Sequence, residues 1–235
     1  MGGAVNTTVQ VGYDDLGRRT SLGQGLNTVS AATSYGYDGA SRLSGLGHDL
    51  AGTSSDLTLR FSYNAGGQIV QNTRSNDAFA WQRHYNFNRG YTANGLDQYT
   101  ASGSVTPTYD ANGNLTGDGS STFAYDDENH FVSASGAASA ALAYDPLGRL
   151  WQVSSSAGTT RFVYDGDRLT AEFDTSGNAT YRYVFGPGTD EPLTMHTLTT
   201  SPRFLKADER GSIVAILDSS GNAIATNSYD EHGLC

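Results

Sequence analysis

The sequence predicts an all-β protein made of tandem β-hairpins, which form a winding, twisted antiparallel sheet or part of a shell. Three observations favour this fold class. The 235 residues include 29 Gly and 14 Tyr but only 5 Pro, a composition typical of short strands joined by tight turns. No stretch shows the sustained apolar periodicity of a helix. A seven-residue unit also recurs along the whole chain.

Each copy of this unit has an aromatic or apolar residue at position 1 and Asp or Asn at position 2. Two variable residues, Gly, a polar residue and an apolar residue follow. The irregular spacing predicts a winding sheet with variable loops rather than a strict solenoid, with a degenerate copy hidden between Tyr63 and Tyr109. Clear copies begin at Tyr13, Tyr37, Tyr63, Tyr109, Tyr125, Tyr144 and Tyr229, a shortened copy begins at Tyr164, and weaker copies begin at Phe173 and Leu217.

The order of residues within a copy predicts a hairpin. If Asp145 and Arg149 face each other across a three-residue loop, Tyr144 and Leu150 form a cross-strand pair on one side of the sheet. Gly148, the last loop residue, then takes the left-handed conformation that glycine adopts most easily. The Asp carboxylate accepts bonds from its own turn. Each copy should therefore turn one Tyr–apolar pair inward and an Asp-bearing rim towards water.

The other copies predict the same hairpin, with a few exceptions to the residue pattern. Tyr109 should pair with Leu115, with Gly113 at the left-handed position. Ser41 is the one residue at position 5 that is neither Gly nor Asn. His130, at position 6, is expected at the surface. Between the turns, alternating segments predict strands at residues 161–164, 180–185 and 211–217.

Composition excludes several classes of function. The formal net charge is −10 and the cations are scattered along the chain without a basic cluster, which argues against a nucleic-acid partner. No apolar run reaches the roughly 20 residues of a membrane span. The five histidines lack metal-ligand spacing, no cofactor motif is present, and the one cysteine, Cys235, leaves no internal disulfide. We therefore expect no cofactor and no metal site.

The sequence contains no convincing catalytic constellation, so we lean against an enzyme without excluding one. Asp190-Glu191 and Asp208-Glu209 are adjacent pairs, whose side chains point to opposite faces of a strand. A weaker alternative is a hydrolase that combines Asp208, Glu209 and His196. A second alternative is a glycan-binding β module, in which Trp151 serves as the ligand platform because it should point away from the Tyr144–Leu150 face.

The residues of the unit resemble the YD repeat of the RHS family. Three longer stretches carry the resemblance further. Residues 90–99 look like the inter-repeat segment of the family, and residues 164–193 resemble the end of a repeat array. Residues 204–233 are similar to the opening of the RHS-associated core.

The resemblance implies a function as well as a fold. Family members wind a strand-turn-strand ribbon into a hollow shell around a C-terminal effector, and many release it with an aspartyl autoprotease. We therefore expect a repeat array at residues 1–200 and a truncated start of the core at 201–235, without autoprotease or cargo. The expected partners are the rest of the parent shell and its effector, in a bacterial parent that is secreted or associated with the cell surface. Unpaired sheet edges predict self-association.

Overall fold

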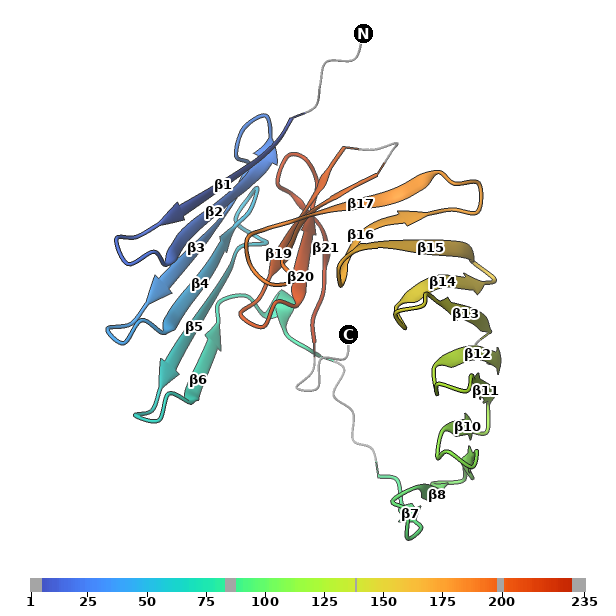
Figure 1. Cartoon of the computed structure of the whole chain (residues 1–235). Helices are drawn as coiled ribbons and strands as arrows, with labels where there is room; N and C mark the ends of the chain where they lie inside the picture. The colour runs from blue at the N-terminus through green and yellow to red at the C-terminus, as the bar shows by residue number, and fades with distance from the viewer. Residues whose placement is uncertain (1–5, 83–87, 138, 198–200, 230–235) are drawn as a thin grey trace. The chain divides into compact units, whose positions relative to one another are not determined.

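A computed structural model of the chain describes residues 6–82, 88–137, 139–197 and 201–229 (Figure 1). Within these residues the regular elements are antiparallel β-strands, apart from one short 3₁₀ turn, η1 (Asp77–Phe79). The all-β prediction is therefore confirmed. His84, His232 and Cys235 lie outside the described residues, as does the last turn after Tyr229.

The chain divides into two compact units, and the first contains residues 1–84 and 182–235. The boundary predicted at residue 200 falls within this unit and stays a prediction. The N-terminal part of unit 1 is one six-stranded meander, in which consecutive strands pair along the sheet. Its strands are β1 (Thr7–Tyr13), β2 (Arg19–Leu26), β3 (Ala31–Tyr37), β4 (Leu43–Asp49), β5 (Leu57–Tyr63) and β6 (Ile69–Arg74).

The C-terminal part of unit 1 continues the same up-and-down pattern. Consecutive strands again pair, so that the chain forms a second set of hairpins. These strands are β18 (Pro192–His196), β19 (Arg203–Ala207), β20 (Ile213–Leu217) and β21 (Ala223–Thr226), and β17 (Ala179–Phe185) contains the boundary between the units.

Unit 2, residues 85–181, is a single layer of short strands. The hairpin β7 (Tyr91–Ala93) and β8 (Tyr99–Ser102) forms a separate two-stranded sheet, and the later strands pair in chain order. Those strands are β9 (Thr108–Tyr109), β10 (Leu115–Gly117), β11 (Ser121–Tyr125), β12 (Phe131–Gly136), β13 (Ala140–Tyr144), β14 (Leu150–Ser155), β15 (Gly158–Asp165) and β16 (Arg168–Phe173).

The repeat turns share one backbone geometry. In the copy at 144–150, the Asp145 N–H donates to the Arg149 carbonyl and the Gly148 N–H donates to the Asp145 carbonyl, each at 2.9 Å. Tyr144 and Leu150 are partners in the strand register, and the register shifts next to them. Because Gly148 has a φ of +76°, the turn places its last residue in the left-handed region.

The same left-handed position recurs where the residue is not glycine. Gly113 has a φ of +90°, and Tyr109 lies opposite Leu115 in the register. Ser41 and Asn129 adopt φ values of +62° and +64° at position 5. The surrounding hairpin therefore imposes this conformation, and glycine is the residue that adopts it with least strain.

Two further copies of the turn are present in the structure. The degenerate copy expected between Tyr63 and Tyr109 is the hairpin at Ala93–Tyr99, where tyrosine stands at position 7 and Asp97 has a φ of +58°. A copy at residues 207–213 escaped the sequence pattern because the small Ala207 replaces the large aromatic or apolar residue of the other copies. Its turn has Gly211 at a φ of +87°.

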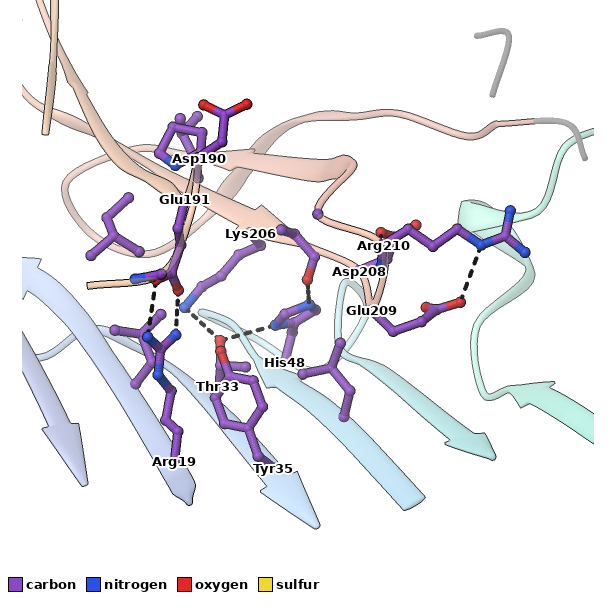
Figure 2. A pocket seen from close by; sticks show the side chains of 18 of the residues that line it. Arg19, Thr33, Tyr35, His48, Asp190, Glu191, Lys206, Asp208, Glu209 and Arg210 are labelled. Atoms are coloured by element: carbon purple, nitrogen blue, oxygen red, sulfur yellow. Dashed lines mark hydrogen bonds and ion pairs between the residues drawn. The ribbon is translucent and has the colours of Figure 1, made fainter. Parts of the chain in front are cut away.

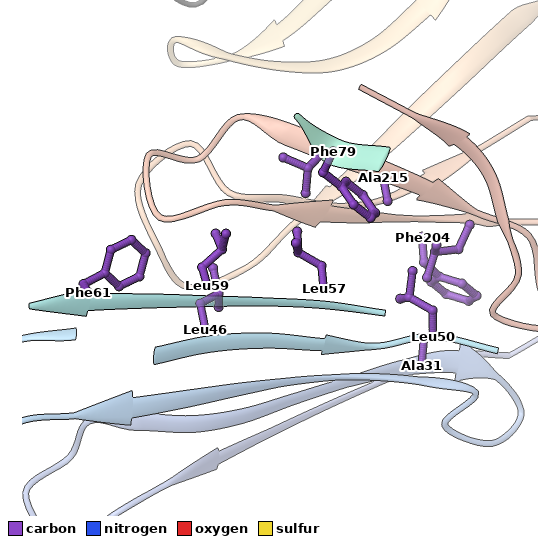
Figure 3. Close-up of a cluster of buried hydrophobic side chains, with 11 residues drawn as sticks. Ala31, Leu46, Leu50, Leu57, Leu59, Phe61, Phe79, Phe204 and Ala215 are labelled. Atoms are coloured by element: carbon purple, nitrogen blue, oxygen red, sulfur yellow. The ribbon is translucent and has the colours of Figure 1, made fainter. Parts of the chain in front are cut away.

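The apolar core lies in unit 1, between the N-terminal meander and the C-terminal strands. Leu57, Leu59 and Phe61 alternate with more exposed residues along β5, so that one face of the strand is buried. Figure 3 shows these side chains facing the C-terminal strands. The buried cluster comprises Ala31, Leu46, Leu50, Leu57, Leu59, Phe61, Phe79, Phe204, Val214, Ala215 and Leu217.

Replacement of Gly17 by Ala should destabilise unit 1 by about 1–2 kcal/mol, because a Cβ disfavours the left-handed backbone. Gly17 has a φ of +74°, and a Cβ at this position would meet no heavy atom within 4 Å, so backbone conformation alone sets the cost. Gly39→Ala is the matched control, since Gly39 is equally uncrowded but needs no positive φ. Urea unfolding followed by circular dichroism compares them, and equal effects would contradict the turn assignment.

Candidate functional site

The tyrosine at position 1 of a hairpin reaches back to the preceding hairpin. Backbone pairing between β2 and β3 ends at Ser21 and Ser34, which leaves the Arg19 carbonyl beyond the ladder. The Tyr37 hydroxyl donates to that carbonyl at 2.9 Å. The tyrosine thus links the two hairpins beyond the last backbone hydrogen bond between β2 and β3. It also supplies a donor for a carbonyl that has no backbone partner there.

This tyrosine–carbonyl bond recurs through both units. The hydroxyl donates in each case to the carbonyl of position 7 in an earlier copy, which is the directly preceding one except for Tyr229, where the copy at 217–223 lies between. The further bonds are Tyr63 to Leu43 at 2.7 Å, and Tyr144 to Phe131, Tyr164 to Leu150 and Tyr229 to Ile213 at 2.8 Å each.

The residue at position 6 covers the tyrosine of the next hairpin. The Arg18 guanidinium lies 4.6 Å from the centre of the Tyr37 ring, and Arg42 lies 4.5 Å from that of Tyr63. Arg149 lies over Tyr164 in the same way, at 4.9 Å. Cation–π attraction therefore joins successive hairpins side by side. We call this arrangement of position-1 and position-6 side chains the turn stack.

His130 corrects the expectation that position 6 is merely surface. Its ring stacks on Tyr144 at 4.6 Å between centroids, where other copies place an arginine. Its Nδ1 lies 3.2 Å from a carboxylate oxygen of Asp126, the position-2 residue of its own turn. An imidazole thus replaces guanidinium in the turn stack, and its partner is the same turn aspartate.

The turn aspartates hold their own loops and aim the stacking cation. Asp14 accepts the backbone N–H groups of Leu16 and Arg18, while its second oxygen binds the Arg18 side chain at 2.7 Å. These bonds, that of the Arg18 side chain first, lower the pKa of Asp14. The Asn178 side chain likewise lowers the pKa of Asp174. One carboxylate therefore fixes both the turn and the arginine that reaches the next hairpin.

The remaining predicted repeat positions are half-buried, with one exception. Tyr109 and Tyr125 lie opposite Leu115 and Phe131 in the register, and Tyr125 packs against the Phe131 ring. Tyr13, by contrast, is 53% exposed. It belongs to the first copy, where no earlier hairpin among the described residues supplies a stacking cation or an open carbonyl.

Replacement of Tyr63 by Phe should lower the stability of unit 1 by about 1 kcal/mol, because the Leu43 carbonyl loses its partner at a half-buried junction. Tyr13→Phe is the matched control, since the Tyr13 hydroxyl bonds no described residue and its ring is exposed. We expect the control to be neutral within about 0.5 kcal/mol in urea titrations. Equal losses in both variants would show that the tyrosine–carbonyl bond contributes nothing.

Unit 1 also contains a cavity of about 400 Å³ between the meander and the C-terminal strands (Figure 2). Leucines from β2, β4, β18 and β19 line part of its wall. Polar groups form the rest, and Arg19 binds Glu191 through both carboxylate oxygens. The Arg19 side chain lowers the pKa of Glu191, so that this ion pair persists in mild acid. Sequence reasoning did not find this cavity.

A chain of hydrogen bonds crosses the cavity wall and fixes the proton positions. His48 Nε2 lies 3.1 Å from the Ala207 carbonyl, an acceptor only, so Nε2 carries the ring proton. Nδ1 then accepts from the Thr33 hydroxyl at 3.0 Å, and Thr33 in turn accepts from Lys206 Nζ at 3.1 Å. Burial, and then the charge of Lys206, lower the pKa of His48 to about 4, which agrees with a neutral ring.

The residues of the hydrolase alternative occupy ordinary structural positions. Asp208 accepts the N–H groups of Arg210 and Ser212 at 2.9 Å, as a turn aspartate does. Glu209 lies 3.7 Å from Arg210, and His196 Nε2 lies 3.1 Å from the Thr194 hydroxyl two residues away. Each of the three side chains thus has a structural partner of its own, and none of these partners belongs to the expected catalytic set.

The candidate ligand platform Trp151 is 43% exposed, and the Arg161 guanidinium lies 5.6 Å from the centre of its ring. One face of the indole is therefore covered by a cation of the same sheet.

No helix among the described residues is long and apolar enough to cross a membrane.

A model of the Teneurin YD-shell family matches residues 1–235. The tRNA3(Ser)-specific nuclease WapA of Bacillus spizizenii is 28% identical over 142 residues, which cover 59% of this chain and 6% of that protein. The double-stranded DNA deaminase toxin A of Burkholderia cenocepacia is 29% identical over 217 residues, covering 75% of this chain and 14% of the toxin.

Among solved structures, the crystal structure of TcdB2-TccC3-TEV aligns with 96% of this chain and 16% of its own chain, at 17% identity and a TM-score of 0.45. The chain thus spans only a small part of the length of each of these relatives.

Proposed function

Since the chain belongs to the teneurin YD-shell family, we propose that it is a wall segment of a shell that encloses a toxic effector. The turn stack is the observation that supports this proposal most directly. The hairpins headed by Tyr37, Tyr63 and Tyr164 each bond to the preceding hairpin through the tyrosine hydroxyl and a stacked arginine, so these hairpins add side by side through their turns. Such a ribbon extends by repetition, as a wall requires.

Unit 2 supports the proposal because its described residues form a layer without a core of their own. Among its described residues, the buried apolar side chains are only Ala171 and Ala179. Its aromatic residues Phe123, Tyr125 and Phe131 contact one another on a sheet face that stays half-buried. A sheet with one such face needs a further surface to cover it. The rest of the parent shell and the enclosed effector are the partners that fit.

Two of the similar proteins bear the names of a nuclease and a deaminase toxin. An effector of that general kind, a toxic enzyme, is the cargo we propose for the parent of this chain. In this assignment residues 1–200 form the end of the repeat array, and residues 201–235 begin the core that follows it.

The test is protease protection in the natural protein that contains this segment. We expect its effector region to resist trypsin while the wall is intact. Tyr144→Ser combined with Tyr164→Ser, which removes two adjacent junctions, should expose the effector to cleavage. Leu147→Ser, at a 76% exposed position of the turn that Tyr144 begins, is the control and should leave protection unchanged. Full protection in the double variant would contradict an enclosing role for this wall.

Self-association is a second part of the proposal, and it rests on β6. All six residues of β6 are exposed, and the strand ends the meander, so that one side of its backbone is open. Val70 is 63% exposed on this edge. An open edge strand is a template for pairing with other chains, and β6 carries only one charge, Arg74 at its end. We expect concentration-dependent dimers in sedimentation and their loss in Val70→Lys, whereas a monomer at all concentrations would contradict the prediction.

Glycan binding at Trp151 remains the alternative function. The uncovered face of the indole is the feature that favours it, since aromatic rings stack on sugar rings. A glycan array identifies any ligand, and Trp151→Ala should abolish its binding if this alternative holds.

A further inference from the structure

The unit 1 cavity contains an amine that the wall function does not use. Lys206 lies on β19, is 1% exposed and lines the cavity together with Leu22, Leu46 and Leu193. It is also the only lysine of the chain. Figure 2 shows its side chain running along the cavity towards Thr33.

Lys206 lacks the carboxylate that a buried ammonium normally requires. None of the ion pairs among the described residues includes it, and its amine donates to the Thr33 hydroxyl instead. An uncompensated charge in such a place is unfavourable, so the amine loses its proton easily. Burial lowers the pKa of Lys206 to about 7, although the more distant charge of Asp49 acts in the opposite direction. Near neutral pH a large share of the amine therefore has a free lone pair.

The charges around the cavity indicate which ligand it accepts. Besides Lys206, the cations are Arg19 and Arg210, and each is paired with a glutamate. The four carboxylates that line the cavity are Asp190, Glu191, Asp208 and Glu209. Carboxylates therefore outnumber cations, which disfavours an anionic ligand. Leucine side chains supply the apolar surface for a small uncharged one.

We propose that this cavity binds small neutral aldehydes and that Lys206 captures them as an imine. The Nζ lone pair attacks the carbonyl carbon, and the carbonyl π electrons move to oxygen, which takes up a proton. The resulting carbinolamine loses water and forms the C=N bond. Amine and aldehyde thus give imine and one water, with no oxidant or reductant.

Thr33 and His48 are positioned to relay the protons of this step. The Thr33 hydroxyl accepts from Nζ and donates to the unprotonated Nδ1 of His48. After the amine attacks the aldehyde, the proton that Nζ releases passes through the Thr33 hydroxyl to the His48 imidazole. The same path returns a proton to the carbinolamine hydroxyl group, which leaves as water. We assign both as positioning and relay residues for the amine.

The experiment is reductive alkylation of the full chain with butyraldehyde and cyanoborohydride near neutral pH, followed by peptide mass mapping. The only other amine is the N-terminal α-amino group, which serves as an internal reference. In the unfolded chain the amine has its ordinary pKa of 10.5 and is almost fully protonated. We therefore expect Lys206 to be butylated at least about tenfold faster in the folded chain than in guanidinium chloride. Slower labelling in the folded chain would overturn the proposal.

Two comparisons separate this site from a merely buried amine. Glyoxylate, an anionic aldehyde of similar size, should label Lys206 several-fold more slowly than butyraldehyde, and a preference for glyoxylate would overturn the assignment of a neutral ligand. Thr33→Val should slow labelling of Lys206 but not of the α-amine, while circular dichroism shows a retained fold. Unchanged labelling of Lys206 in Thr33→Val would contradict the assignment of Thr33 as a proton relay. Effector protection in the natural protein is a separate readout, so a failure here leaves the wall function intact.

Discussion

Phe204→Ala should lower the free energy of unfolding of unit 1 by about 3–5 kcal/mol, the largest single loss we expect in this chain. Phe204 is 0% exposed and belongs to the cluster that joins the C-terminal strands to the meander. Removal of its ring leaves a cavity that rigid neighbouring strands cannot close. Because strands distant in sequence meet at this point, the loss should affect both parts of unit 1.

The matched control is Val184→Ala, a truncation in the same unit at a side chain that is 46% exposed. We expect it to cost less than about 1 kcal/mol. Urea unfolding followed by circular dichroism gives both values. Equal losses in the two variants would mean that the two parts of unit 1 do not share a core.

Lys206→Met should stabilise the chain near pH 7 and remove a rise in stability at higher pH. The folded pKa of Lys206 is lowered from 10.5 to about 7, so the unfolded chain binds the proton more tightly. Between these values the unfolded state carries more protons, and stability therefore increases as pH rises through the window. The full linkage is on the order of 4–5 kcal/mol.

The measurement is the urea midpoint of both proteins from about pH 7 to about pH 9, where tyrosines of the unfolded chain still keep most of their protons. His48, whose pKa is lowered mainly by burial, is neutral in this pH range, and groups distant from Lys206 titrate alike in the two proteins, so the difference between the curves isolates Lys206. We expect the stability of the wild type to increase relative to that of the Lys206→Met variant as pH rises. Parallel curves would mean that Lys206 keeps its charge in the fold.

The hairpin turns were predictable because their information is local. Asp at position 2 and Gly at position 5 lie three residues apart, and the backbone bonds that they permit close within the same seven residues. The copy at Ala207 was missed because the pattern gave most weight to a large aromatic or apolar first residue. Its Asp208 and Gly211 carry the turn without one.

The turn stack was not predictable from the repeat alone. Arg18 and Tyr37 belong to different copies, and the irregular spacing of the copies hides which cation covers which ring. His130 looked like a surface residue because position 6 is polar, whereas its ring lies against Tyr144. A prediction of this contact requires the strand register on both sides of the junction.

The cavity was even less predictable from the sequence than the turn stack. Lys206 is 173 positions away from Thr33, and an isolated lysine in a strand pattern gives no sign of burial. The signal that sequence did contain was its uniqueness in the chain. Only the packing of β19 against β3 converts that residue into a buried amine without a carboxylate partner.

A double-mutant cycle on Arg42 and Tyr63 tests the turn stack most directly. Arg42 covers the ring of Tyr63 in the next hairpin, at 4.5 Å, while Tyr37 heads the hairpin of Arg42 itself. We predict a coupling free energy of about 0.5–1 kcal/mol between Arg42→Gln and Tyr63→Leu. The same cycle with Tyr37→Leu should give a coupling near zero. No coupling in the first cycle, or equal coupling in both, would contradict the claim that successive hairpins are joined through these side chains.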